Sequence, residues 1–219
     1  MLTLHYHPFA AFCQKALIAL YERDVAFTPQ LVDLADAGHR AAFEAVWPIR
    51  KFPVLVDDGA GRTIPESSII IEYLDLARPG AAPMVPTAPE AALEARLWDR
   101  LFDNYVAVPM QRIVAERIRG IDVKDPHGEA EARAILATAY RTLETRLAGR
   151  IWAAGDTFTL ADCAAAPALF YADWVQPFRG DHPILGAYFA RLMARPSVAR
   201  VVDEARPWRR LFPGGAPEA

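Results

Sequence analysis

The 219-residue sequence is poor in the residues that mark disulfide-rich and metal-binding proteins. Its only two cysteines, Cys13 and Cys163, are too few for a disulfide framework or a cysteine-based metal cluster. The five histidines do not have the spacing of metal ligands. We therefore expect no metal cofactor, and we expect a protein of the reducing cytoplasm.

Long apolar runs and runs of like charge are also absent. No segment of about 18 or more apolar residues predicts a membrane span. The first residues, MLTLHYHP, lack the basic start and the long apolar stretch of a signal peptide. The net charge of −3 gives no broad basic field for nucleic acid. We expect neither a membrane nor a nucleic-acid partner.

Apolar residues, in contrast, are plentiful at 53%, enough for one large domain or two small ones. Strand and helix patterns alternate over residues 1–78 in the order βαβαββα, which predicts a small mixed sheet covered by helices. The strands are expected at 2–6, 26–33, 54–56 and 62–64, and the helices at 12–22, 39–46 and 66–77.

The rest of the chain reads as a linker followed by helices. Four prolines and one glycine at positions 78–89 favour an extended linker, which we place at 79–89. Residues 90–219 are expected to form an all-helical domain, with Thr159 and Asp162 as a capping box. Its helices are expected at 90–118, kinked at Pro109, and at 129–148, 183–195 and 197–205.

Two segments suggest a site for a short peptide. Pro53 precedes an apolar strand, and a cis Phe52–Pro53 bond would leave the backbone of Phe52 free to pair with an extended peptide. The alternative is an ordinary turn proline. Glu66 and Ser67 open a helix whose N–H groups attract a carboxylate, while Glu66 suits an ammonium. The alternative is simple N-capping. Lys51 could reach a second carboxylate, or be solvated surface charge.

These segments occur in one order that resembles the cytosolic glutathione transferases over nearly the whole chain. The resemblance is carried by LTLHY, FCQKALIAL, WPIRKFPVLVD, PESSIIIEYL and FTLADCAAAPALF. It implies a thioredoxin-like domain followed by an all-helical domain, glutathione as co-substrate, and a homodimer. It also implies that the backbone at Phe52 and Pro53 binds the cysteinyl part of glutathione. Glu66 and Ser67 would hold the γ-glutamyl end.

By the same resemblance, Lys51 and His39 would meet the glycyl carboxylate of glutathione. Arg50 stands where the family often has glycine. A homodimer is also favoured by the residues themselves, because the helix predicted at 66–77 is apolar nearly all round and the sheet can cover only one side.

The group that activates the thiol departs from the family pattern. The family uses Tyr, Ser or Cys near the first strand–helix turn, but Ala10 and Ala11 occupy the Ser and Cys positions. Tyr6 is the one side chain that could activate the thiol. The backbone amides near Ala11 and Phe12 are the alternative donors. Cys13 is expected to be a small core residue.

Four residues recur at helical spacing and could line an apolar pocket for an electrophile: Trp98, Phe102, Tyr105 and Arg112. The alternative is that they form helix core or a subunit contact. Four aromatic residues nearer the C-terminus could close the same pocket: Tyr171, Trp174, Trp208 and Phe212.

The leading interpretation is an enzyme that conjugates the glutathione thiolate to a small apolar electrophile. A glutathione-dependent thiol or peroxide reductase is one alternative, although Ala10 stands where its first cysteine would be. A non-catalytic ligand-binding protein of the same fold is another, and it is favoured by the two alanines, Ala10 and Ala11.

Overall fold

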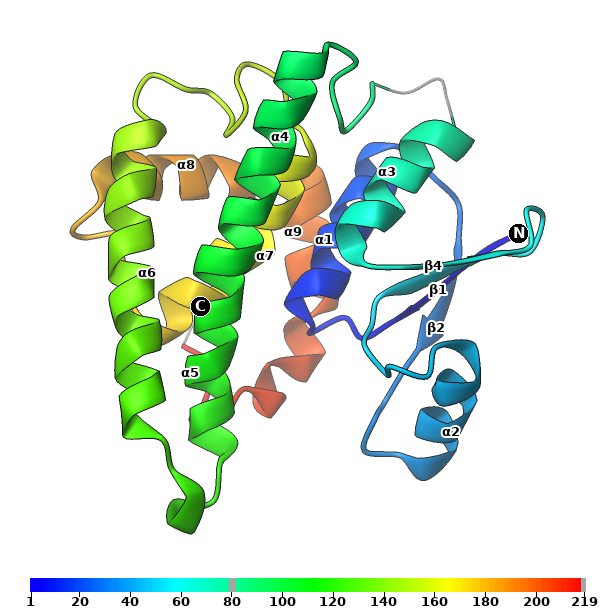
Figure 1. Cartoon of the computed structure of the whole chain (residues 1–219), viewed down its shortest axis with the longest axis horizontal. Helices are drawn as coiled ribbons and strands as arrows, with labels where there is room; N and C mark the ends of the chain where they lie inside the picture. Colours follow the sequence, from blue (N-terminus) through cyan, green and yellow to red (C-terminus); the bar gives the residue numbers. More distant parts are fainter. Residues whose placement is uncertain (79–81, 218–219) are drawn as a thin grey trace.

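The computed structural model describes residues 1–78 and 82–217 and shows an α/β layer beside a helical bundle (Figure 1). The order βαβαββα, followed by helices, confirms the predicted thioredoxin-like fold and the helical domain after it. Of the predicted linker, residues 79–81 lie outside the described residues, and residues 82–88 form neither helix nor strand.

The sheet has four strands in the order β2-β1-β3-β4. β1 runs parallel to β2 and antiparallel to β3, and β3 pairs antiparallel with β4. The outer strand at residues 26–33 is shorter than predicted. The strands are β1 (Leu2–Tyr6), β2 (Thr28–Leu31), β3 (Val54–Asp57) and β4 (Arg62–Pro65).

Three helices cover the two faces of this sheet, namely α1 (Ala11–Glu22), α2 (Ala37–Val46) and α3 (Ser67–Ala77). Successive strand residues point to opposite faces. Leu55 therefore joins the main core with α1 and α3, while its neighbour Val54 packs with Phe43 of α2. The site described below forms where α1 and α3 begin.

The remaining helices form the second domain, in which α4 and α5 make one long rod beside α6 (Figure 1). At the predicted capping box, Thr159 accepts from the N–H of Ala161 and Asp162 accepts from the N–H of Thr159. None of the described helices is long and apolar enough to cross a membrane. The helices are α4 (Pro89–Phe102), α5 (Val108–Ile118), α6 (Pro126–Arg146), α7 (Leu160–Val175), α8 (Pro183–Met193) and α9 (Pro196–Glu204), with 3-10 turns at Ile121–Val123 and Arg206–Leu211.

The rod differs from the predicted single helix at 90–118. A π-turn, η1 (Asp103–Ala107), separates α4 from α5. Pro109 lacks an N–H, and its ring would clash with the carbonyl four residues earlier in an α-helix, so a wider turn just before it is expected. The π-turn shifts the helical phase by one residue. As a result, Val106 and Ile113 are buried where an unbroken helix would bury Tyr105 and Arg112.

Candidate functional site

A cavity of about 450 Å³ lies between the two domains. From the α/β domain it is lined by the start of α1, the segment before β3 and the start of α3. From the helical domain it is lined by α4, η1 and α5. We call it the interdomain cavity. Five of the predicted glutathione residues line it: Lys51, Phe52, Pro53, Glu66 and Ser67.

The segment before β3 presents a free backbone edge to this cavity. The Phe52–Pro53 peptide bond is cis. Among the described residues, neither the N–H nor the C=O of Phe52 has a backbone hydrogen-bond partner. Both groups are therefore available to pair with an extended peptide.

The start of α3 presents a second binding element. Glu66 is the N-cap at φ 69°, yet its side chain makes no capping hydrogen bond, which speaks against the simple N-capping alternative. A non-glycine residue in this conformation is disfavoured by roughly 1–3 kcal/mol, and such strain gathers at functional sites. Ser67 is buried but lines the cavity. The helix start can thus hold a carboxylate while Glu66 faces an ammonium.

Cations outnumber carboxylates around the interdomain cavity. Arg50, Lys51 and Arg100 line it, against Glu66 and Asp103. Arg50 has φ 56°, the left-handed conformation that suits the glycine common at this position in the family. Arg100 pairs with Asp99 and Asp103, so Arg50 and Lys51 are the cations that fit an anionic ligand.

A buried ion cluster joins α1 and the start of α3 to the long rod of the helical domain. The Nζ atom of Lys15 lies 2.5 Å from a carboxylate oxygen of Asp99 and 2.8 Å from one of Asp103. It also donates a 2.8 Å hydrogen bond to the hydroxyl of Ser68. Burial raises the pKa of Asp103, and the charge of Lys15 opposes that rise. The cluster fixes α1 and α3 against the helical domain.

The start of α1 offers free amides to the same cavity. Ala10 is the N-cap and gives no side-chain cap. Among the described residues, the N–H groups of Ala11 and Phe12 have no hydrogen-bond acceptor. Both residues line the cavity. Cys13 is fully buried, as predicted, and burial raises the pKa of its thiol.

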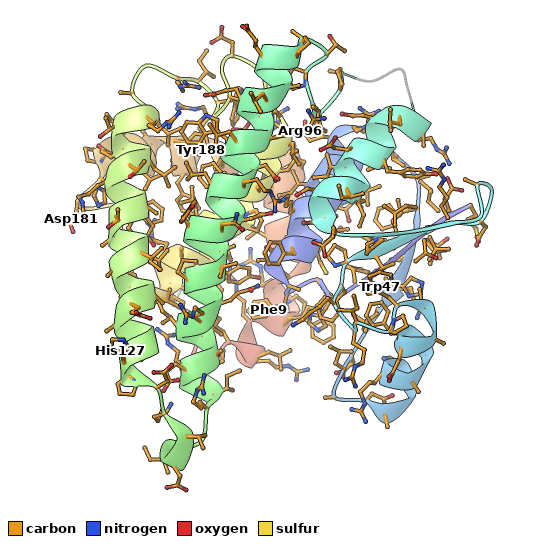
Figure 2. All side chains as sticks on the ribbon, viewed as in Figure 1. Phe9, Trp47, Arg96, His127, Asp181 and Tyr188 are labelled. Atoms are coloured by element: carbon orange, nitrogen blue, oxygen red, sulfur yellow. The ribbon has the colours of Figure 1, made fainter. Side chains whose placement is uncertain are left out.

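An apolar pocket of about 320 Å³ adjoins this point. Three residues line both the pocket and the interdomain cavity: Ala10, Ala11 and Gln111. The rest of the pocket is mainly hydrophobic, and Figure 2 shows one of its residues, Phe9, at the junction of the two domains. Its other apolar lining includes Met110, Val114, Tyr171 and Phe212.

The structure corrects the prediction for Tyr6. Its side chain lines a separate cavity of about 810 Å³ with Glu204 and Trp208, and it does not line the interdomain cavity. Strand alternation turns Tyr6 away from the α2 side, which His5 faces, and toward α9. Burial and Glu204 both raise the pKa of its hydroxyl. Tyr6 is therefore not placed to meet a thiol there.

The four residues predicted to line an electrophile pocket on the long helix, Trp98, Phe102, Tyr105 and Arg112, do not lie on one face. Trp98 and Phe102 are fully buried and stack with ring centroids 5.8 Å apart. Tyr105 and Arg112 are exposed and line neither the interdomain cavity nor the apolar pocket. The π-turn explains this result, because it shifts the helical phase after Phe102.

Some of the predicted C-terminal aromatic residues lie at the apolar pocket, whereas Trp208 and His39 lie elsewhere. Tyr171 and Phe212 line the apolar pocket, and Trp174 packs on Phe212 at 4.9 Å between ring centroids. Trp208 lines the separate cavity that Tyr6 also lines. His39 is exposed at the start of α2 and does not line the interdomain cavity.

Sequence reasoning missed the contribution of the helical domain to the cavity, which comes mainly from Arg100, Asn104, Val108 and Gln111. The last three follow an i, i+4, i+7 spacing on one side of η1 and α5. That spacing could have predicted that the three residues share one helical face. It predicts that this face lines the cavity only when the shift in helical phase before Pro109 is known.

Comparison with known proteins identifies the family. The family model described as "Glutathione S-transferase, N-terminal domain" matches residues 4–82, and "Glutathione S-transferase, C-terminal domain" matches residues 107–196. The chain belongs to the glutathione S-transferase family. A relative named glutathione S-transferase-like protein LUC7, from Fusarium sp, is 35% identical over 131 residues. That alignment covers 59% of this chain and 58% of the relative, so it spans less than two-thirds of that protein's length.

Solved glutathione S-transferase structures resemble this one over most of its length. One from Methylobacillus flagellatus with glutathione bound has a TM-score of 0.84 at 26% identity, covering 92% of this chain and 98% of that one. One from Methylobacterium radiotolerans in complex with glutathione sulfonate has a TM-score of 0.81 at 29% identity, covering 92% and 94%.

Proposed function

We propose that this family member binds glutathione in the interdomain cavity and conjugates its thiolate to a small apolar electrophile. The observation that carries the proposal is the meeting of a cationic cavity and an apolar pocket at the start of α1. Glu66 and Ser67 hold the γ-glutamyl end, the backbone of Phe52 pairs with the cysteinyl part, and Lys51 meets the glycyl carboxylate. The sulfur then lies at the junction with the pocket.

The chemical task is to form a thiolate near neutral pH. The thiol proton leaves to water, the sulfur forms a bond to carbon, and the leaving group departs with its electron pair. Lowering a thiol pKa from about 8.5 by about two units requires roughly 2.7 kcal/mol. A helix N-terminus contributes up to about 2 kcal/mol in a partly buried geometry. The amides of Ala11 and Phe12 therefore account for much of the requirement.

The structure weighs against the alternative of a thiol or peroxide reductase. A reductase that works through a protein thiol needs a cysteine that solvent can reach, whereas Cys13 and Cys163 are both fully buried. A steady-state assay with glutathione and a panel of apolar electrophiles tests the proposal. Glutathione binding without turnover of any electrophile would favour the non-catalytic ligand-binding alternative.

Glutathione should bind, and Glu66→Ala or Ser67→Ala should weaken binding about 10- to 150-fold. Each variant loses one charge-assisted hydrogen bond, worth roughly 1.5–3 kcal/mol. Titration calorimetry measures the affinities, and Glu131→Ala, an exposed glutamate on α6, is the matched control. Unchanged affinity in both variants would exclude this site.

A homodimer is also proposed. Ile70, Ile71 and Leu74 of α3 are buried, but Ile69 remains 52% exposed and Leu76 81% exposed. Such residues on the surface of a monomer suit a subunit contact. Light scattering at micromolar concentration should give twice the mass of one chain, and a monomer mass would contradict the proposal.

We also propose a cytoplasmic location and the limits of the two domains. Two buried cysteines without a disulfide are consistent with the cytoplasm. We place the glutathione-binding domain at 1–78, the linker at 79–89 and the helical domain at 90–219.

A further inference from the structure

The interdomain cavity and the apolar pocket meet at a junction where a residue could contact the glutathione sulfur. Under the proposed function, the sulfur must reach both the interdomain cavity and the apolar pocket. Of the three residues that line both, Ala10 and Ala11 carry only methyl groups, and Gln111 alone carries a polar side chain.

Other side-chain donors near the junction are already engaged or face elsewhere. The hydroxyl of Tyr171 donates to the carbonyl of Phe9 at 3.0 Å and accepts from Gln14 at 2.9 Å. The thiol of Cys13 is fully buried. Tyr6 lines the other cavity. None of these groups is free to turn toward a sulfur at the start of α1.

Gln111, in contrast, is exposed and lines both the interdomain cavity and the apolar pocket. It belongs to α5 of the helical domain, whereas the amides of Ala11 and Phe12 belong to the start of α1, and all three residues line the interdomain cavity. A carboxamide N–H is a donor that does not ionise. It can therefore stabilise a thiolate without competing for its proton.

We propose that Gln111 donates a hydrogen bond to the glutathione thiolate and is a catalytic residue of this enzyme, replacing the hydroxyl or thiol that Ala10 and Ala11 lack. The inference rests on the proposed function. The thiolate would then be held between two backbone amides of one domain and a side chain of the other, so its stabilisation requires both domains.

The test measures the pKa of bound glutathione from the ultraviolet absorbance of the thiolate as pH is varied. Gln111→Leu keeps the approximate size but removes the donor, and it should raise this pKa by about one unit. Gln111→Glu places a carboxylate beside the thiolate and should raise the pKa further. At pH values below the pKa, kcat/KM should fall about tenfold in Gln111→Leu. The deficit should shrink as pH rises, because the free thiol then ionises by itself.

Two controls make the result specific. Gln30→Leu changes an exposed glutamine on β2, outside both cavities, and should leave the pKa unchanged. Asn104→Ala removes an amide that lines the interdomain cavity but not the apolar pocket, and should alter glutathione affinity without the same pKa shift.

The outcomes separate this inference from the proposed function. If wild-type protein forms the thiolate and Gln111→Leu has the same thiol pKa, Gln111 is not the donor, although the proposed function stands. Loss of affinity with no pKa change also overturns the inference, because Gln111 then only binds. If wild-type protein neither binds glutathione nor forms the thiolate, the proposed function fails with it.

Discussion

Lys15→Met is expected to lower the free energy of unfolding by about 3–5 kcal/mol. Lys15 is 1% exposed, and it lies between Asp99 and Asp103, which are 3% and 7% exposed at their side chains. Methionine fills similar space but removes the buried cation, so that among the described residues only Arg100, whose side chain is 51% exposed, still pairs with the two carboxylates. Urea denaturation measures the change, and Lys51→Met, at an exposed lysine, is the matched control that should change stability little.

The deficit of Lys15→Met should depend on pH with a definite sign. Burial already raises the folded-state pKa of Asp103, and without the opposing charge of Lys15 it should rise further above its unfolded value. The folded protein then binds more protons than the unfolded chain, so stability falls as pH rises above the unfolded pKa of about 4. The deficit should therefore shrink toward acidic pH.

A combined variant separates charge from packing in this cluster. Adding Asp99→Asn and Asp103→Asn to Lys15→Met removes both buried negative charges, and it should recover much of the lost stability. If Lys15→Met alone is as stable as wild type at neutral pH, the cluster does not join the two domains as described.

Asp162→Ala should lower stability by a similar amount, about 3–5 kcal/mol. The Asp162 carboxylate accepts hydrogen bonds from the N–H of Ala153 at 2.9 Å, the N–H of Thr159 at 2.9 Å and the hydroxyl of Tyr188 at 2.6 Å. Each bond to a charged group contributes roughly 1.5–3 kcal/mol, and the donors left behind are buried. Thermal denaturation measures the loss.

Its matched control is Asp156→Ala, an exposed aspartate just before the capping box. This variant should stay within about 0.5 kcal/mol of wild type. A small effect of Asp162→Ala would mean that the start of α7 is held by packing alone. Because Asp162 is fully buried, we also expect Asp162→Asn to be costly, since an amide nitrogen cannot accept from Thr159.

Features that depend on a few neighbouring residues were predictable from the sequence. Thr159 and Asp162 form a capping box because both partners lie within one helical turn. Glu66 and Ser67 were expected at a helix start, and the strand after Pro53 was expected from its apolar run. The order of strands and helices followed from their periodicity, which each segment carries by itself.

The contribution of the helical domain to the site was decided by tertiary structure. Gln111 and Arg100 reach the cavity because α4 and α5 pack beside the starts of α1 and α3, which lie far earlier in the sequence. The burial of Lys15 likewise depends on carboxylates from the other domain. No local pattern can contain such information.

The helical phase of the rod formed by α4, η1 and α5 shows why the sequence alone could not predict which residues line the cavity. A constant helical period from Trp98 selects Tyr105 and Arg112, but these two are exposed and their neighbours Val106 and Ile113 are buried instead. One π-turn before Pro109 makes the difference. By itself the sequence determined that a helix and a proline occur here. Only the packed structure decided how the chain accommodates that proline, and hence which side chains line the interdomain cavity.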